Sequence, residues 1–588
     1  MSYIIDQKNC SGCHRCRMEC PVEAISFKND KYWINPDKCI SCGACVTVCH
    51  NGCISNPEAP EPKGSSHDTV KMACDVVVIG AGGAGMVAAA KAQDQGANVI
   101  LLEKNHEIGG SAWYATGFAV HYSKWHKEAG KTDERDQKYQ EFLQKTAGYD
   151  VNPELVKRLF DANADWIDWM IDQHHLSDLY EYNPKAFGPM SFRKKVTPPW
   201  NDRRIDAMIG PGGGGWAITS SLLRDFTSKG GTVLCSTPAK QLLTDERGAI
   251  TGVVAQDAGG RIEISCKAVV VSSGAFTRNR EIMDKMQPLF YQDEGKQPVH
   301  IFTCSTCTGD GITMCEAIGA DVDYKNRRVN MFGPMRHPYP AVTLNSGNGP
   351  MFRTDGNRFQ MDFKMTEVSD LVNVPNWYVW KIVDDAGFEA NIQHKIHQGR
   401  DEHGVDLTPF LKNWRKIVQE EADAGSVVIA NSITELGAKL NFDPVRFAAD
   451  IMEYNLGLVG PKKPPMDENG PDDTANAPVP DGDGPDMNVL AALMGPPAQP
   501  LSKGPYYAIK MGMFHENSMG GMVIDKNANV TKGGEPIPGL YAAGDTTRGV
   551  MVPGDIGVQY IEGVFTALTY AFNSGYIAGS EAAEFALQ

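Results

Sequence analysis

The chain has 588 residues, too many for a single hydrophobic core, and carries a formal net charge of −16. Its 42% hydrophobic and 22% charged residues are ordinary for a globular protein. Because no lysine- or arginine-rich stretch offsets the negative charge, the sequence argues against a nucleic-acid partner. It shows no apolar run long enough to span a bilayer and no basic-then-apolar leader in its first residues, so we expect a cytoplasmic protein.

Two matching runs of cysteines occupy the first 49 residues, each with three cysteines at two-residue spacing and a fourth after three more residues. A [4Fe–4S] cube needs four converging thiolates, and in a doubled run of this kind the fourth cysteine reaches the neighbouring cube. Zinc sites do not use this doubled spacing. The first expected ligand set is Cys10, Cys13, Cys16 and Cys49, and the second is Cys39, Cys42, Cys45 and Cys20.

This segment resembles the bacterial two-cluster ferredoxins, which implies an α+β domain with two [4Fe–4S] clusters over residues 1–58. Cys53 lies outside both runs, and we interpret it as a small buried residue rather than a ligand. Cys304-x2-Cys307 with Cys315 could indicate a third metal or redox site, but no fourth ligand lies nearby in sequence, so core thiols are the favoured interpretation. Fifteen cysteines without a disulfide framework fit a reducing compartment.

Two proline-rich stretches interrupt the chain. Residues 59–72 lack apolar periodicity and indicate a linker. Residues 461–500 hold ten of the 35 prolines and indicate a long loop. Its function could be that of a lid or partner contact, and a solvated insertion is an equally good interpretation.

After the first linker, the sequence predicts a dinucleotide site. The continuous apolar run at residues 75–79 is typical of a buried parallel strand, and Gly80-x-Gly82-x2-Gly85 follows it, then a small-residue helix. The glycines permit a tight turn and a close approach to a pyrophosphate at the helix N-terminus. Glu103 ends the next apolar strand, where a carboxylate can bind both ribose hydroxyls.

Later motifs resemble, in one order, the FAD-dependent fumarate reductase/succinate dehydrogenase flavoprotein family. They are Gly109-Gly110-Ser111, Ser273-Gly274-Ala275-Phe276, Thr308-Gly309-Asp310-Gly311 and Gly544-Asp545. The resemblance covers about residues 73–588 and implies bound FAD. It places Gly109 and Gly110 against the pyrophosphate and flavin, and Asp545 at the ribitol.

The fold class implied is α/β: a Rossmann-like FAD-binding domain with an inserted α+β capping domain, preceded by the ferredoxin domain. The expected bounds are 1–58 for the ferredoxin domain, 59–72 for the linker, 73–328 with 514–588 for the FAD-binding domain, and 329–513 for the capping domain. The active site would lie where the cap meets the isoalloxazine. No second dinucleotide fingerprint is present, so no NAD(P)H site is predicted.

The resemblance also implies catalytic positions, and this chain departs from several of them. His337 matches a substrate-pocket histidine of the family. Phe388 stands where the family's proton-donating arginine is expected, and Asp555 replaces a late arginine. Tyr507 resembles a catalytic tyrosine of the related ketosteroid dehydrogenases, although packing against the flavin is the favoured interpretation. Arg358 could protonate or orient a substrate, or could be structural.

A carboxylate at Asp555 would repel a dianionic substrate. We therefore expect an iron–sulfur flavoprotein oxidoreductase that reduces an activated C=C bond, in an enone or an α,β-unsaturated acid rather than a dicarboxylate, by hydride from FAD. A redox protein would supply electrons through the two clusters. The alternatives are a dehydrogenase running in reverse, an enzyme like adenylylsulfate reductase, and a non-catalytic electron-transfer subunit.

Overall fold

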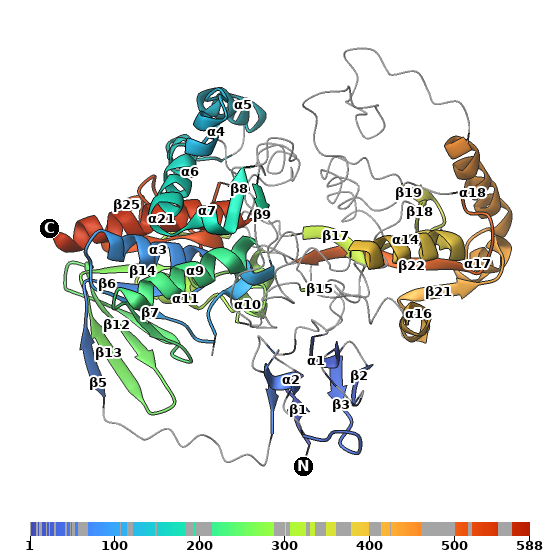
Figure 1. The fold of residues 1–588 in the computed structure, drawn as a ribbon, viewed down its shortest axis with the longest axis horizontal. Helices are drawn as coiled ribbons and strands as arrows, with labels where there is room; N and C mark the ends of the chain where they lie inside the picture. The colour runs from blue at the N-terminus through green and yellow to red at the C-terminus, as the bar shows by residue number, and fades with distance from the viewer. Residues whose placement is uncertain are drawn as a thin grey trace.

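The computed structural model (Figure 1) describes most of the chain. The described residues are 2–7, 10, 15–18, 20, 22, 24–28, 31–41, 44–47, 49, 53–56, 69–105, 107–114, 122–147, 150–182, 192–194, 214–286, 300–301, 306–324, 330–334, 349–359, 378–398, 413–423, 425–459, 500–515, 520–550 and 567–588.

A mostly parallel sheet forms the centre of the first lobe, and in the described part it has six strands in the order β10-β7-β6-β14-β25-β24. The strands are β6 (Val76–Ile79), β7 (Val99–Leu102), β10 (Thr232–Leu234), β14 (Ala268–Val271), β24 (Asn529–Lys532) and β25 (Glu535–Ala542). All pairs are parallel except β24 with β25. Every residue of β6, β7 and β14 is buried, as the continuous apolar runs predict for strands covered on both faces.

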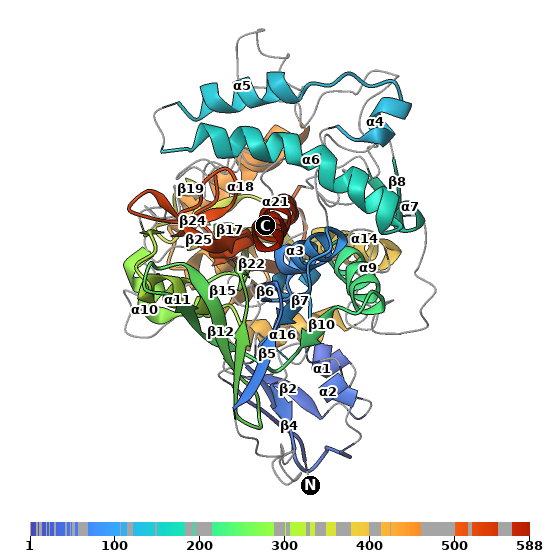
Figure 2. The ribbon, with the colours of Figure 1, turned by 90° about the vertical axis from the view of Figure 1, so that its left-hand side faces the viewer.

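Helices flank this sheet, with α3 and the C-terminal helix α21 lying side by side in both views (Figures 1 and 2). The helices are α3 (Gly83–Asp94), α4 (Lys124–Glu128), α5 (Arg135–Lys145), α6 (Pro153–Gln173), α7 (Leu176–Leu179), α9 (Gly214–Ser228), α10 (Arg280–Met286), α11 (Asp310–Ala317) and α21 (Ala567–Leu587), with 3-10 turns η1 (Gly110–Tyr114) and η5 (Gly544–Thr546). A second sheet joins β5 (Val70–Ala73) to β11 (Ala239–Thr244), β12 (Ile250–Gln256) and β13 (Arg261–Ser265). Two short pairs complete the lobe: β8 (Tyr180–Tyr182) with β9 (Phe192–Lys194), and β16 (Val322–Asp323) with β23 (Gly521–Met522).

The second lobe is built on β22 (Tyr506–His515), which pairs with four other strands of its sheet. The other strands of this sheet are β15 (His300–Ile301), β17 (Asn330–Pro334), β18 (Met351–Arg353), β19 (Arg358–Phe359), β20 (Tyr378–Asp384) and β21 (Val427–Ala430). Its helices are α14 (Asp385–Gln398), α16 (Trp414–Asp423), α17 (Ile433–Lys439) and α18 (Pro444–Val459). Apolar side chains of β18, β20 and β22 pack with those of α17 and α18 in a core separate from that of the first lobe.

The N-terminal module pairs β1 (Ile4–Ile5) with β4 (Ile54–Ser55), and β2 (Ile25–Lys28) with β3 (Lys31–Ile34). Two one-turn helices, α1 (Arg15–Met18) and α2 (Ala44–Thr47), lie between the strand pairs in sequence. The expected fold class is confirmed, with a mixed helix and sheet FAD-binding fold and an α+β N-terminal module. The domain bounds stay predictions. Strand β5 lies almost wholly in the expected linker but pairs with β13 of the first lobe. Strand β15 lies in a segment expected for the FAD-binding domain but pairs with β22 of the second lobe.

Both proline-rich stretches fall almost wholly outside the described residues. Among the described helices, none combines the length and apolar character needed to cross a bilayer.

Glycines let α3 and α21 approach until their backbones touch. A Cβ on Gly575 would stand 2.4 Å from the carbonyl oxygen of Ala84, and one on Gly579 would stand 2.4 Å from that of Ala88. Real side chains never come so close to a backbone oxygen, so only glycine permits this packing. The contact presses α21 onto the helix that follows the predicted pyrophosphate loop.

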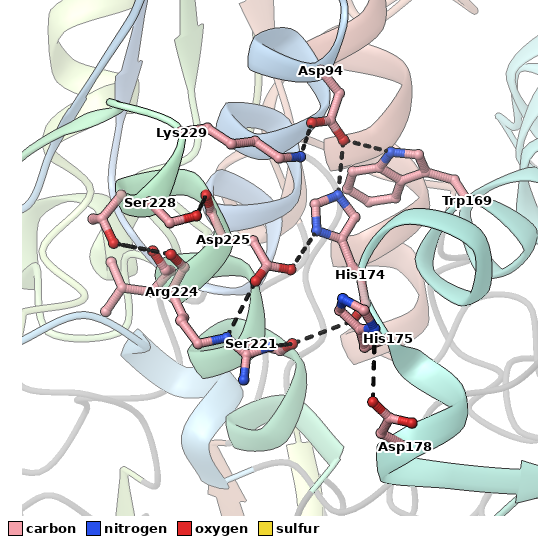
Figure 3. A network of polar contacts seen from close by, with 12 residues as sticks. Asp94, Trp169, His174, His175, Asp178, Ser221, Arg224, Asp225, Ser228 and Lys229 are labelled. Carbon is pink, nitrogen blue, oxygen red and sulfur yellow. Dashed lines mark hydrogen bonds and ion pairs between the residues drawn. The ribbon is translucent and has the colours of Figure 1, made fainter.

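The His174 side chain ties three helices of this lobe together (Figure 3). Its Nε2 lies 2.8 Å from Asp94 Oδ2 at the end of α3, and its Nδ1 lies 3.0 Å from Asp225 Oδ2 on α9. Asp94 also accepts hydrogen bonds from Trp169 on α6 and from Lys229.

This network changes the acidity of Asp94. Burial alone would raise the pKa of its carboxyl group, but the hydrogen bonds from His174 and Lys229, with that from Trp169, outweigh burial and lower the pKa to about 2. A folded-state pKa below the unfolded value of 3.8 means that Asp94 stabilises the fold fully above pH 3.8. That contribution is lost as the pH falls through about 2.

The glycine contact predicts opposite effects for the same substitution in two helices. Gly575→Ala should lower the stability of the first lobe by about 1–3 kcal/mol, because its methyl group meets the Ala84 carbonyl. Gly457→Ala on α18, where no atom lies within 4 Å of the new Cβ, should stabilise by roughly 0.5–1 kcal/mol. Calorimetric unfolding of both variants tests this, and equal shifts would contradict close packing of α3 on α21.

The His174 network predicts that Asp94→Asn destabilises the protein at pH 7 by about 2–4 kcal/mol, since it leaves buried donors without their carboxylate. The matched control is Asp178→Asn, which removes an exposed aspartate 3.7 Å from the neighbouring His175. Because that pair is exposed, we expect a change within about 0.5 kcal/mol. An Asp94→Asn variant as stable as the control in calorimetry would refute a structural role for the network.

Candidate functional site

An open cavity lies in the first lobe, at the carboxyl ends of four strands. Its lining includes the last residues of β6 and β7 and the residues that directly follow β14 and β25. In open parallel sheets this edge is where nucleotides bind. The lining residues that belong to the predicted FAD set are Gly80, Gly82, Glu103, Gly110, Ser111, Gly274, Gly544 and Asp545.

The predicted pyrophosphate loop forms one wall of this cavity. Gly80 has φ +100°, and a Cβ there would lie 2.5 Å from the Ser272 carbonyl oxygen. A Cβ on Gly85 would lie 1.8 Å from the Gly80 oxygen, which explains why helix and strand can pack so closely. Gly82 caps α3 without any side-chain hydrogen bond, so the first N–H groups of the helix are not taken by a capping side chain. This geometry fits a phosphate at the positive end of α3.

Glu103 lies where the loop meets the second strand. Its Oε2 accepts a hydrogen bond from the Ala81 N–H at 2.8 Å, and its Oε1 accepts one from the Asn105 N–H at 2.7 Å. Burial raises the pKa of this carboxyl group, and the two N–H groups lower it in part. Each carboxylate oxygen has a further lone pair, so Glu103 can still accept from ribose hydroxyls, as predicted.

Asp545 lies in η5, which begins one residue after the end of β25, and its half-buried side chain lines the cavity wall. Burial raises the pKa of its carboxyl group to about 7. Buried carboxylates are stabilised by hydroxyl or N–H donors, which the ribitol of a flavin would provide. Around it, Gly544 donates its N–H to Ser574 Oγ at 2.9 Å, and this bond links η5 to α21.

The cavity also contains residues that the sequence analysis did not assign to FAD. Lys104 donates to Thr308 Oγ1 at 2.5 Å and forms an ion pair with Asp310 at 2.9 Å. Cys307, which we had interpreted as a core thiol, is buried in the cavity wall with its sulfur 3.5 Å from Ser111 Oγ. Two features of the sequence could have placed these residues at the cavity: the Thr308-Gly309-Asp310-Gly311 motif, and the position of Lys104 directly after Glu103.

In the N-terminal module, three of the four thiols expected at the second cluster line one small cavity. They are Cys20, Cys39 and Cys45, while Cys42 lies outside the described residues. Burial raises the pKa of the Cys39 thiol, but N–H groups of Ser41 and Tyr3 lower it, and the balance falls below the usual value. This cavity fits an anionic cluster held by thiolates.

The thiols expected at the first cluster are also brought together. Cys10, Cys16 and Cys49 are buried in the core of the module, and Cys13 lies outside the described residues. Cys53 joins them, with its sulfur 3.4 Å from that of Cys49. No three described side chains lie together as ligands of a single metal ion.

The four predicted catalytic residues are not brought together in the described part of the chain. His337 and Asp555 lie outside it. Arg358 places its guanidinium 5.8 Å from the centre of the Tyr454 ring on α18. Neither Arg358 nor Tyr507 lines the FAD-type cavity, and the roles of all four stay predictions.

Tyr507 lies in an aromatic cluster of the second lobe. Its hydroxyl donates to Asp385 Oδ1 at 2.8 Å, and burial together with this carboxylate raises the pKa of the phenol. Its ring packs edge-on against Phe388 and Trp414, which stack on each other at 4.8 Å. Phe388 thus contributes to packing within this lobe, and Tyr507 already uses its proton in a hydrogen bond.

Two protein-family models match the chain. The model of the FAD binding domain matches residues 75–554, and that of the 4Fe-4S dicluster domain matches residues 2–50. The chain belongs to the FAD binding domain family. This confirms the predicted flavoprotein and its iron–sulfur module at the level of the two domains, while the number of clusters stays a prediction.

Two relatives and one solved structure show what this family member is similar to. An NADH:fumarate oxidoreductase of Klebsiella pneumoniae is 28% identical over 540 residues, which are 90% of the chain but only 50% of that relative. A vinyl phenol reductase of Lactiplantibacillus plantarum is 26% identical over 541 residues, 87% of the chain and 97% of the relative. Both names are those of oxidoreductases, in keeping with the expected enzyme class.

The fold of the family member is similar to that of a 3-ketosteroid Δ1-dehydrogenase from Sterolibacterium denitrificans. The TM-score is 0.63 at 16% identity, covering 87% of the chain and 99% of that structure.

For FAD binding, we expect Asp545→Asn to raise the dissociation constant about tenfold or more, because an amide replaces a charged acceptor worth roughly 1.5–3 kcal/mol. In flavin-free protein the effect on stability is the reverse. The folded-state pKa of about 7 lies above 3.8, so the cost of burying the ionised carboxylate grows as pH rises from 3.8 to about 7.

The stabilising effect of Asp545→Asn on flavin-free protein should therefore be larger at pH 8 than at pH 5. Flavin titration and thermal unfolding at both pH values measure the two effects. Asp136→Asn is the control, since that carboxylate is 88% exposed on α5 and should alter neither quantity. Unchanged FAD affinity in Asp545→Asn would rule out the ribitol contact.

Proposed function

We propose that the chain is an oxidoreductase that reduces an activated C=C bond of a small organic acceptor, with electrons entering through two [4Fe–4S] clusters. The observation that supports it is the presence, on one chain, of a nucleotide cavity at the carboxyl ends of parallel strands and a second cavity lined by thiols. When bound, FAD supplies hydride chemistry and exchanges single electrons with the clusters, which carry one electron each.

The residues of the first lobe would bind and orient the flavin. The glycine loop leaves α3 N–H groups for the pyrophosphate, Glu103 accepts from the ribose, and Asp545 accepts from the ribitol. The buried sheet and α21 exclude water from one side of the cavity. The proposed cluster ligands are Cys10, Cys13, Cys16 and Cys49 for the first cluster, and Cys39, Cys42, Cys45 and Cys20 for the second.

The proposed acceptor is an enone or an unsaturated monocarboxylate rather than a dicarboxylate. Asp555 would face the substrate where the family's pattern has an arginine, and two like charges in a dry pocket repel by several kcal/mol. His337 would hydrogen-bond the substrate's remaining carbonyl or carboxylate. A relative covered almost completely by this chain is named for vinyl phenol, which carries no carboxylate.

The proposed electron donor is a redox protein of the cytoplasm, where thiolates stay reduced. The relative named for NADH is covered over only half its length, so its donor does not carry over to this chain. The chain has one dinucleotide fingerprint, and the FAD-type cavity uses it.

Anaerobic reoxidation of the reduced flavin, followed at its oxidised absorption band, tests this function. We expect fast reoxidation by cinnamates, urocanate or 3-ketosteroid enones, and slow reoxidation by fumarate. Asp555→Asn should raise the rate with fumarate about tenfold or more relative to its rate with a neutral enone, because it removes one repulsive charge.

Fast fumarate turnover by the unsubstituted protein would contradict the non-dicarboxylate pocket. If no small acceptor reoxidises the flavin while a protein partner does, the chain is an electron-transfer subunit and the enzyme proposal fails.

A further inference from the structure

The N-terminal module is an internal repeat with a period of 29 residues. Cys10 and Cys39, Cys20 and Cys49, and the strand residues Ile25 and Ile54 are each separated by that number. The sequence runs after the fourth cysteine of each half are Cys20-Pro-Val-Glu-Ala24-Ile25 and Cys49-His-Asn-Gly-Cys53-Ile54. By register, Cys53 is therefore the counterpart of Ala24.

The backbone hydrogen bonds repeat in the same way and close into a two-fold arrangement. Asn35 donates to the Ala24 carbonyl at 2.8 Å, and Asp6 donates to the Cys53 carbonyl at 2.7 Å. Cys39 donates to Asn35 at 3.0 Å, and Cys10 donates to Asp6 at 3.0 Å. The end of each half thus binds the start of the other.

The repeat also relates the walls of the two cluster sites. At the second site, Ala24 lines the cavity together with Cys20 and Cys39, and its N–H donates to Cys20 Sγ at 3.2 Å. The counterparts of these three residues are Cys53, Cys49 and Cys10. Side-chain contacts join those counterparts, with Cys53 Sγ 3.4 Å from Cys49 Sγ and in hydrogen-bond contact with Cys10.

We propose that Cys53 is a fifth thiol of the first cluster: it donates a hydrogen bond to the ligand sulfur of Cys49, and it serves as a reserve ligand if that sulfur is lost. A cysteine that ligates iron is a thiolate and can only accept, so the shared proton must come from Cys53. At the second cluster Ala24 contributes only its backbone N–H to Cys20 Sγ and has no side-chain donor, which makes the two sites unequal despite the repeat.

Two consequences follow from this arrangement. Hydrogen bonds to ligand sulfurs favour the more negative, reduced cluster, so the first cluster should have a higher potential than it would without Cys53. When Cys49 is removed, the S–H bond of Cys53 breaks, its proton passes to water, and its sulfur bonds the iron that Cys49 held. No electron is transferred in this exchange.

Iron retention in the full chain tests the reserve ligand. Cys49→Ala should keep both clusters with four irons each, by iron analysis and by electron paramagnetic resonance of the reduced protein. The matched control is Cys20→Ala, whose neighbouring Ala24 cannot ligate, and it should lose iron from the second cluster. The double substitution Cys49→Ala/Cys53→Ala should lose iron in the same way from the first cluster. Equal iron loss in Cys49→Ala and Cys20→Ala would overturn the reserve-ligand role.

A potentiometric titration tests the hydrogen bond without removing any predicted ligand. Cys53→Ala should lower the midpoint potential of one cluster only, and the signal lost in Cys20→Ala identifies the other, second cluster. Ala24→Cys should raise the potential of that second cluster, because it installs the missing thiol. Unchanged potentials in Cys53→Ala would overturn the donor role, and neither readout depends on which substrate the flavin site uses.

Discussion

Direct contact between backbones, with no side chain between them, is the constraint on which the first lobe depends. The Gly80 backbone lies against that of Ser272, directly after β14, and Gly85 packs directly on Gly80. Gly575 and Gly579 let α21 pack closely onto α3. These contacts set the depth of the cavity floor and the position of the α3 N-terminus. Because backbone atoms cannot change rotamer, the floor is rigid before any ligand enters.

Polar ties then hold the helices around that floor. His174 links the far end of α3 to α6 and α9 through two carboxylates, and the Gly544 N–H links the Asp545 turn to α21. The carboxylates of Asp94 and Asp545 therefore have different roles in this lobe. Asp94 is stabilised by its partners, whereas burial raises the pKa of Asp545 and makes its ionised form costlier. A protein can retain such a costly carboxylate where it serves binding.

Much of the first lobe and of the thiol module could be predicted from the sequence. Strand β6, the glycine loop and Glu103 follow one another within 30 residues, so local pattern and function coincide there. Three of the thiols that the cysteine spacing assigns to one cluster line the cavity of the thiol module, and their ligand roles stay predictions. The links between Lys104 and Asp310 and between His174 and Asp94 join residues about 80 to 200 positions apart, and no periodicity encodes them. Tyr507 shows the same limit, since its motif suggested chemistry but its partner Asp385 lies 122 residues earlier.

The cyclic closure of the thiol module has a consequence for how such modules can be combined. Pairing β1 with β4 brings residues near its two ends together, and each expected cluster takes three thiols from one half and the fourth from the other. Neither half could therefore assemble a complete cluster alone. The segment that connects the two halves and the break between the two ends of the module occupy equivalent positions in this closed arrangement. A circularly permuted module, cut at the connection and joined at the ends, would therefore present the same two sites. A unit with adjacent ends can be attached to a larger protein through one tether without altering its interior.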